Sequence, residues 1–145
     1  MLTHRFVKEK LLDGSFSFRS KIPVTLIGDS TSMKFLAVLD SGADVSIIPK
    51  VIADFLGINC DLESKKHFLG FGKEMFECAG ARTDMLFHCR QERLSEKLEN
   101  VPVLIALSGE EKEPVLGCAG VFDSFNITFL HGRKIRLLRV QNKTW

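Results

Sequence analysis

The sequence between residues 35 and 48 reads Phe35-Leu-Ala-Val-Leu-Asp-Ser-Gly-Ala-Asp-Val-Ser-Ile-Ile48, in which an acidic turn separates two apolar segments. Five apolar residues run directly into Asp40, and the second apolar segment begins at Val45. A carboxylate at the end of a buried strand is costly unless it is hydrogen-bonded, paired or partly protonated. Ser41 and Gly42 supply a hydroxyl group and a backbone free of Cβ, which favour a tight turn around that carboxylate. The pattern therefore predicts two strands joined at Asp40, although an isolated Asp-Ser-Gly is also typical of a plain turn that ends a strand.

Short apolar or alternating runs on both sides of this stretch predict further strands. The predicted strands cover residues 15–18, 22–27, 35–39, 45–48, 101–107, 125–130 and 134–140, and residues 66–89 are predicted to form a long hairpin that bends at Gly70 and Gly72. Pro49 before residues 50–56 and Gly57 after them are typical of a short helix, and a second short helix is predicted at 117–122. Residues 91–100 are charged and are predicted to form a loop or one helical turn. The predicted fold class is therefore mostly β, with one or two short helices.

The length of 145 residues corresponds to about one domain, and 45% hydrophobic with 26% charged residues is a globular composition. We expect residues 1–14 to form a partly ordered N-terminal arm and residues 15–145 a single domain. A net charge of +2 favours neither nucleic acid nor a membrane surface as a partner. The first residues lack a signal-peptide core, and the longest apolar run, 101–107, is far too short to span a membrane. A cytoplasmic location is therefore expected, with reduced thiols at Cys60, Cys78, Cys89 and Cys118.

Together with two later segments, residues 35–48 resemble the active-site region of the aspartic proteases of the retropepsin type. In that family a hydrophobic strand leads into Asp-Thr/Ser-Gly-Ala and then into a second apolar strand. His67-Phe-Leu-Gly-Phe-Gly-Lys-Glu74 resembles the glycine-bearing tip of the family's flap. Pro114-Val-Leu-Gly117, followed by residues 121–129, resembles the hydrophobic-hydrophobic-Gly element and the helix that close the fold. The three segments occur in the family's order, and the resemblance implies a retropepsin-like closed β-barrel or sandwich.

The resemblance also implies an aspartic endopeptidase that needs no cofactor. Two neighbouring carboxylates share one proton, so that one takes a proton from water while the other donates one to the scissile carbonyl group. The chain has a single Asp-Ser-Gly, because Asp123-Ser124 is followed by Phe125 and Asp13 directly by Gly14. The second carboxylate must come from a second copy of the chain, which implies a C2 homodimer with one Asp40 from each subunit.

The same resemblance implies roles for other residues of the three segments. Ser41 is expected to hydrogen-bond across the dimer, and Gly42 to let a peptide backbone lie close to the carboxylates. The expected substrate-binding residues are Ala43, Asp44, Ile47, Gly70, Phe71, Gly72 and Val115, with residues 70–72 as a lid. The expected substrate is a peptide or an unfolded protein bound in extended form. The alternative is a catalytically weak retropepsin-like module that dimerises or binds peptides.

One position departs from the family pattern. Many retroviral members carry an Arg after the hydrophobic-hydrophobic-Gly element, where it pairs with the Asp two residues after the glycine of the triad. Here Cys118 stands in that place, and Asp44 is the Asp. A carboxylate that loses its guanidinium needs another partner. The candidates, from this chain or from the second copy, are Arg5, Arg19, Arg133 and Arg136.

The remaining histidines, cysteines and basic residues give no strong pattern for another kind of site. They lack the paired spacing of cysteines that structural zinc requires, so no metal site is predicted. His88 and Cys89 are neighbours on a predicted strand and point to opposite faces, so they cannot act together as a nucleophile and its base. Residues 133–139 alternate basic and apolar side chains, which predicts a strand with a solvated basic face rather than a site for nucleic acid.

Overall fold

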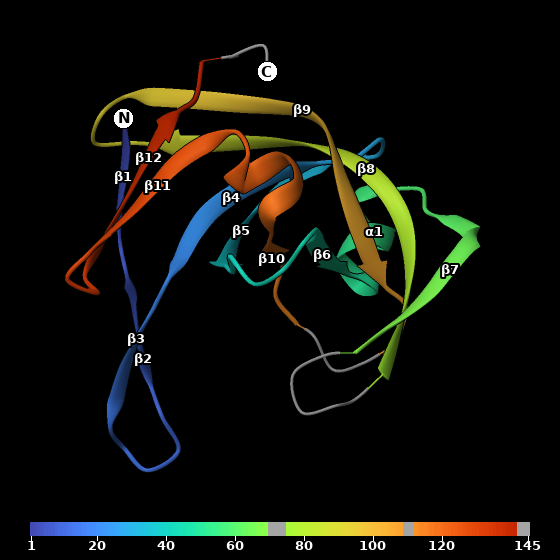
Figure 1. Cartoon of the computed structure of the whole chain (residues 1–145), viewed down its shortest axis with the longest axis horizontal. Coiled ribbons are helices and arrows are strands. Elements are labelled where there is room, and N and C mark those ends of the chain that lie inside the picture. Colours follow the sequence, from blue (N-terminus) through green and yellow to red (C-terminus); the bar gives the residue numbers. More distant parts are fainter. Residues whose placement is uncertain (70–74, 109–111, 142–145) are drawn as a thin grey trace.

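The computed structural model describes residues 1–69, 75–108 and 112–141, and a large sheet forms the main body of this part of the chain. The order of its seven strands is β4-β5-β10-β6-β9-β8-β7. Because β4 also pairs with β8, six of the strands close into a barrel (Figure 1). In sheet order, the strands are β4 (Lys21–Ile27), β5 (Ser32–Leu39), β10 (Val115–Leu116), β6 (Ser46–Pro49), β9 (Leu94–Ala106), β8 (Met75–Cys89) and β7 (Asp61–Leu69).

The core of the barrel fixes the strand that leads into Asp40. Ile22, Val24 and Leu26 alternate along β4 and are almost completely buried. β5 pairs with β4 in antiparallel register, and its last residues include the buried Ala37 and Leu39. Removing a side chain of this size from water contributes about 1.5–3 kcal/mol. The end of β5 is therefore held in place by the core on one side and by its neighbouring strands at its edges.

A smaller sheet and a hairpin lie outside the barrel. The sheet has the order β1-β12-β11, and a separate antiparallel pair joins β2 to β3 (Figure 1). Their strands are β1 (Leu2–Arg5), β12 (Lys134–Arg139), β11 (Phe125–Leu130), β2 (Val7–Lys10) and β3 (Phe16–Arg19). The predicted strands 125–130 and 134–140 are confirmed here. The sequence predicts no strand before residue 15, whereas β1 pairs with β12 through partners such as Leu2 and Leu137.

The two predicted short helices are present in different degrees. α1 (Lys50–Leu56) follows Pro49 and ends at Gly57, whose φ of 76° lies in the left-handed region that glycine adopts easily. η1 (Cys118–Phe122) is a single irregular turn, because Ala119 and Gly120 inside it have non-helical backbone angles. No helix among the described residues has the length and apolar character needed to cross a membrane.

The prediction of a loop or one helical turn at 91–100 holds for the turn at 91–93 but is wrong for residues 94–100. After a turn that includes Arg93 at a positive φ of 49°, the chain enters β9 at Leu94 and pairs with β8 along the length of the hairpin. Leu94, Glu96 and Leu98 lie on the more buried face, while Ser95 and Lys97 between them are exposed. The alternation of apolar and polar residues is too weak to predict a strand. The turn at 90–93 folds these residues back onto the end of β8, which supplies the hydrogen bonds of the strand.

Candidate active site

The loop after β5 folds around the carboxylate of Asp40. The backbone N–H of Gly42 donates to Oδ1 of Asp40 over 2.9 Å, and the N–H of Ala43 donates to the carbonyl oxygen of Asp40 over 3.1 Å. A Cβ placed on Gly42 would lie 3.2 Å from the same Oδ1 atom, so the backbone passes close to the carboxylate. Asp40 itself is half-buried. The sequence analysis expected a turn that holds the carboxylate at a strand end, and these contacts are that turn.

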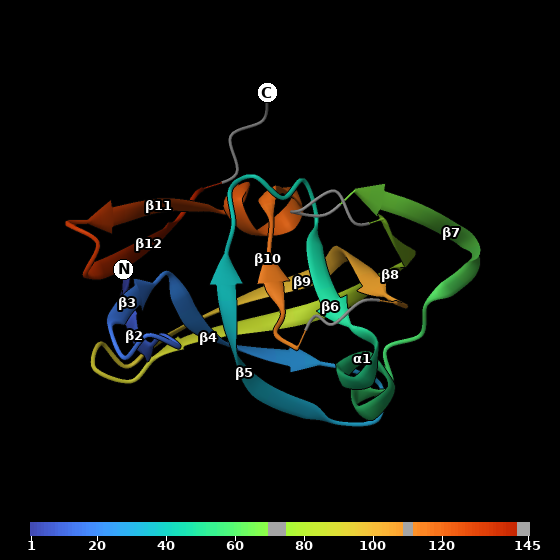
Figure 2. The same ribbon diagram turned by 90° about the horizontal axis from the view of Figure 1, so that it is seen from below.

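β10 and the residues that follow it are hydrogen-bonded to the same loop. β10 lies between β5 and β6, parallel to the first and antiparallel to the second. Figure 2 shows η1 beside the loop that joins β5 to β6. Three backbone hydrogen bonds join the two segments, namely Asp40 N to Leu116 O (3.0 Å), Cys118 N to Ala43 O (2.8 Å) and Ala119 N to Asp44 O (2.8 Å). The main chain around Asp40 is therefore fixed independently of the side chains that surround it.

Gly117 occupies a position where a side chain has no room. A Cβ there would lie 2.6 Å from the carbonyl carbon and oxygen of Val45 and 2.7 Å from the carbonyl oxygen of Ala43. The N–H of Gly117 donates to the buried hydroxyl oxygen of Ser46 over 2.9 Å. The sequence analysis did not single out Ser46, and its only signal was a polar residue at an inward position of an apolar strand. The close approach of Gly117 to Val45 and its hydrogen bond to Ser46 together hold the segment after β10 against the Asp40 loop and β6.

The structure brings most of the predicted site residues to one region. Ser41 is exposed beside Asp40, and Asp44 is exposed further along the same loop. Ile47 and Val115 are Cα partners on β6 and β10, and both side chains are half-buried. The predicted lid residues Gly70, Phe71 and Gly72 lie outside the described residues, although the strands that lead to and from them, β7 and β8, pair as the predicted hairpin requires.

Cys118, which stands where many retroviral relatives carry an arginine, makes a different contact. The Sγ atom of Cys118 donates to the carbonyl oxygen of Ser41 over 3.3 Å. Among the described residues of one chain, no basic side chain forms an ion pair with Asp44, which is solvent-exposed and is bonded through its backbone oxygen. The arginines considered from the sequence therefore do not replace the family's ion pair within a single described chain.

The thiols and imidazoles do not assemble into a second reactive centre. His88 is exposed and Cys89 is buried, so the two neighbours point to opposite faces of β8 as predicted. Burial raises the pKa of the Cys78 thiol to about 11, which leaves it protonated and unreactive near neutral pH. Within the described part of the chain, no three His, Cys, Asp or Glu side chains are grouped so that they could hold a metal ion.

Comparison with known proteins gives a structural match only. No protein-family model matches the sequence, and no curated protein is similar to it. Among solved structures, the fold is similar to a retropepsin-like aspartic protease from Rickettsia conorii, with a TM-score of 0.53 and 18% sequence identity over 93% of this chain and 91% of that one. The chain has the retropepsin-like fold. The predicted fold class, a mostly β retropepsin-like barrel with short helices, is confirmed. At 18% identity the match shows that the two chains share a fold, and it does not show that they share an activity.

Proposed function

We propose that two copies of the chain form an aspartic endopeptidase in which the two Asp40 carboxylates meet at a two-fold axis. The observation that supports this most directly is a half-buried carboxylate at the end of a barrel strand, held by the Gly42 N–H in a fold shared with an aspartic protease. Hydrolysis of a peptide bond by acid–base catalysis needs two carboxylates within reach of one water. Two-fold pairing supplies the second carboxylate without any other acid.

In the proposed dimer the two carboxylates share one proton, because two negative charges so close together cannot both persist. The ionised carboxylate takes a proton from water, and the water oxygen attacks the carbonyl carbon of the peptide. The protonated carboxylate donates its proton to the carbonyl oxygen. The carbon–nitrogen bond then breaks as the nitrogen takes a proton from one carboxyl group, while a hydroxyl group of the intermediate returns a proton to the other carboxylate and restores the shared proton of the dyad. The Gly42 N–H holds the carboxylate of Asp40, and the bond from the Asp40 N–H to the Leu116 carbonyl oxygen holds its backbone throughout these steps.

The residues around the loop suggest how a substrate would lie. Ile47 and Val115 offer a small apolar surface next to the loop, and Ala43 is half-buried beside it. An extended peptide would place alternate side chains against such a surface while its backbone bonds to the strand edges. In the proposed dimer, Ser41 hydrogen-bonds across the interface, Asp44 contacts the substrate, and residues 70–72 serve as the lid. A cytoplasmic location is part of the proposal, supported by the four free cysteines.

A second candidate is a dimerising or peptide-binding module with little catalytic power. It is favoured by one observation, the Cys118 thiol where retroviral relatives carry an arginine, since the Sγ contact to Ser41 is weaker than an ion pair. The second candidate shares with the enzyme either its dimerisation or its binding of peptides. Only the enzyme hypothesis predicts that the protein cleaves peptides and that this cleavage depends on the carboxyl group of Asp40.

The test is cleavage of an unfolded protein mixture between pH 4 and 7 by the wild type and by the Asp40→Asn variant. We expect the variant to lose at least about a thousandfold of the activity, since it can neither take up nor release a proton at this position. Asp123→Asn is the matched control, because it makes the same chemical change at an exposed carboxylate outside the loop. If wild type and Asp40→Asn are equally inactive while both still dimerise, the module is the better description.

A mixing experiment tests whether the site is shared. Wild-type and Asp40→Asn chains, unfolded together in equal amounts and refolded, pair at random if the protein is a dimer. About a quarter of the dimers then carry two native carboxylates, so activity is expected near a quarter of the unmixed wild type. Activity near half would mean that each chain works alone and would contradict the shared dyad.

A further inference from the structure

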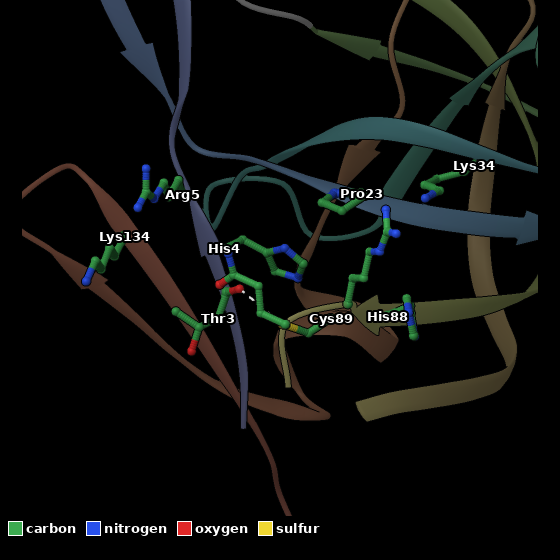
Figure 3. A pocket seen from close by; sticks show the side chains of 10 residues that line it. Thr3, His4, Arg5, Pro23, Lys34, His88, Cys89 and Lys134 are labelled. Carbon is green, nitrogen blue, oxygen red and sulfur yellow. Dashed lines mark hydrogen bonds between the residues drawn. The ribbon is translucent and has the colours of Figure 1, made fainter. Parts of the chain in front are cut away.

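A hollow of about 330 Å³ lies away from the Asp40 loop, between β1 and the outer side of the barrel. Residues of β1, β4, β5, β8, β12 and the turn after β8 line it, and most of them are drawn in Figure 3. Its lining residues are Thr3, His4, Arg5, Pro23, Lys34, His88, Cys89, Arg90, Gln91 and Lys134. The volume is at the lower end of the range for small-molecule sites. None of the lining residues belongs to the Asp40 loop or to the segment after β10 that is hydrogen-bonded to it.

The lining of this hollow is strongly positive. It includes Arg5, Lys34, Arg90 and Lys134, which come from three strands and a turn and are all exposed. No acidic residue lines it, although Glu92 lies next to it, where it accepts a hydrogen bond from the Thr3 hydroxyl and acts electrostatically on His4. None of these four forms an ion pair with a carboxylate in the described part of the chain. The whole chain has a net charge of only +2, so this concentration of positive charge is local. Like charges that converge on one cavity repel one another unless an anion neutralises them.

A histidine inside the hollow has an unused hydrogen-bonding atom. Nε2 of His4 is shielded from solvent and has no hydrogen-bond partner among the described residues. In Figure 3 the His4 ring lies between Arg5 and Lys134 on one side and Pro23 and Lys34 on the other. A buried, unsatisfied nitrogen of this kind costs free energy, which a small movement of the ring toward a hydrogen-bonding ligand would recover. The kind of occupant is indicated by the positive side chains, which favour an anion.

A second hollow extends the first along the outer face of the barrel. Its volume is about 220 Å³, and it shares Pro23, Lys34 and His88 with the first. The residues it adds are Thr25 and Leu86, which are Cα partners on β4 and β8. This part of the surface is less charged than the first. A ligand with an anionic end in the first hollow has room for an uncharged part in the second.

We propose that these joined hollows bind a small polyanion of the phosphate or polycarboxylate class. Arginine presents a planar fork of N–H donors that matches both phosphate and carboxylate, and lysine adds mobile positive charge. An anion that carries several charges can pair with several of these exposed side chains at once, whereas monovalent counterions only screen them separately. The small volume selects a compact molecule over a protein or nucleic-acid surface. This inference does not depend on the proposed peptidase activity, because the site uses none of its residues.

The test is calorimetric titration of the folded chain with tripolyphosphate, with citrate and with acetate, at pH 7.5 and constant ionic strength. We expect tripolyphosphate or citrate to bind at least tenfold more tightly than acetate, and the stronger of the two identifies the class of anion. The double variant Lys34→Gln/Arg90→Gln should weaken that binding at least tenfold. Arg5→Gln/Lys134→Gln, which changes the other side of the hollow, serves as a second variant if the first does not fold.

The matched control is Lys10→Gln/Lys112→Gln, which removes the same charge from exposed lysines outside the hollow. It should change the affinity less than twofold, because exposed charges further than about 8 Å away are largely screened at physiological salt. An equal loss in the control and the test variants would show a general charge effect and overturn the proposal. Wild-type protein that binds neither polyanion better than acetate would also overturn it.

Discussion

The Asp40 loop and the N-terminal segment are both held by backbone hydrogen bonds, but they differ in how much side chains add to that attachment. The loop is held by backbone hydrogen bonds from the residues after β10, and by the close approach of Gly117 to Val45. The N-terminal segment is held by a strand ladder to β12, by the buried side chain of Leu2, and by ion pairs that involve Glu9. A close backbone contact is disrupted by a single added atom. The stability that a side-chain contact contributes instead changes gradually with the volume and charge of the side chain and with pH.

The largest effect is expected in the N-terminal segment, from Leu2→Ala. Leu2 has no solvent-exposed surface and belongs to the main hydrophobic cluster. Its truncation should lower the free energy of unfolding by about 4 kcal/mol, through lost burial and the cavity left behind. Urea unfolding of the variant measures this. Leu12→Ala makes the same change in the same segment at a fully exposed side chain and should be nearly neutral. Similar small losses for both variants would mean that β1 is not part of the folding unit.

The next largest effect is expected at the Asp40 loop, from Gly117→Ala. The added Cβ would collide with the backbone of Val45, and a backbone cannot move aside as a flexible side chain can. We expect a loss of about 3 kcal/mol, the upper end for overpacking, together with loss of any peptidase activity. Gly132→Ala is the control, because φ at Gly132 is +60° but nothing lies within 4 Å of the added atom. It should cost about 1 kcal/mol from the backbone angle alone.

A Gly117→Ala variant no less stable than Gly132→Ala would mean that the loop and the segment after β10 can separate. The comparison of the two glycines therefore measures how rigid the site is.

The same contrast explains what could be predicted from the sequence. Asp40, Gly42 and the helix between Pro49 and Gly57 were predicted because their signals are local, in residues that bond to near neighbours along the chain. The closing Pro114–Gly117 element was predicted from its resemblance to a family motif. These parts are the ones on which the fold and the candidate site depend most.

The parts that were missed have no strong strand signal of their own. β1 pairs with β12 at the other end of the chain, and the charged residues at the start of β9 form a strand because the turn at 90–93 folds them back onto β8. Nothing in residues 2–5 or 94–100 alone requires a strand. The basic hollow was missed because Arg5, Lys34 and Arg90 are brought together only by the folded barrel.

A smaller effect is expected from Lys21→Met, which removes the link between the N-terminal hairpin and the barrel. The buried Lys21 ammonium donates to Glu9 on β2 and, over 2.8 Å, to Glu113. Hydrogen bonds between charged groups contribute about 2 kcal/mol, and this is the expected loss in free energy of unfolding at pH 8. Lys10→Met, at an exposed lysine of the same hairpin, should change stability by less than about 0.5 kcal/mol.

The pH dependence of the Lys21 variant has a defined sign. Burial alone would lower the pKa of Lys21, but hydrogen bonds and charges from Glu113 and Glu9 outweigh it, so the pKa lies above its ordinary value of 10.5. The stabilisation is therefore complete below pH 10.5 and is lost as the pH rises through the higher pKa of the folded state. The difference between wild type and Lys21→Met should narrow above pH 10.5. A difference that stays constant there would show that the lysine acts through packing alone.

The smallest effect is expected from Glu92→Gln, in the turn between β8 and β9 that contacts the start of β1. Glu92 accepts a hydrogen bond from the Thr3 hydroxyl over 2.8 Å and lies 3.8 Å from the N-terminal ammonium of Met1. Both contacts are exposed, so their loss should cost no more than about 0.5 kcal/mol at pH 8. Urea unfolding between pH 5 and 8, for wild type and variant in parallel, measures the difference.

Below pH 7 the two proteins should diverge, because Glu92 also acts on His4. Burial lowers the pKa of His4 from its ordinary value of 6.5, the charge of Glu92 raises it in part, and His88 lowers it. A histidine with a lowered pKa stays neutral in the folded chain but takes up a proton when the chain unfolds, so stability falls as the pH drops below 6.5. Removing the Glu92 charge lowers the pKa of His4 further and should steepen that fall. A shallower fall in the variant would mean that Glu92 stabilises β1 mainly through its own ion pair, and that the buried His4 contributes little.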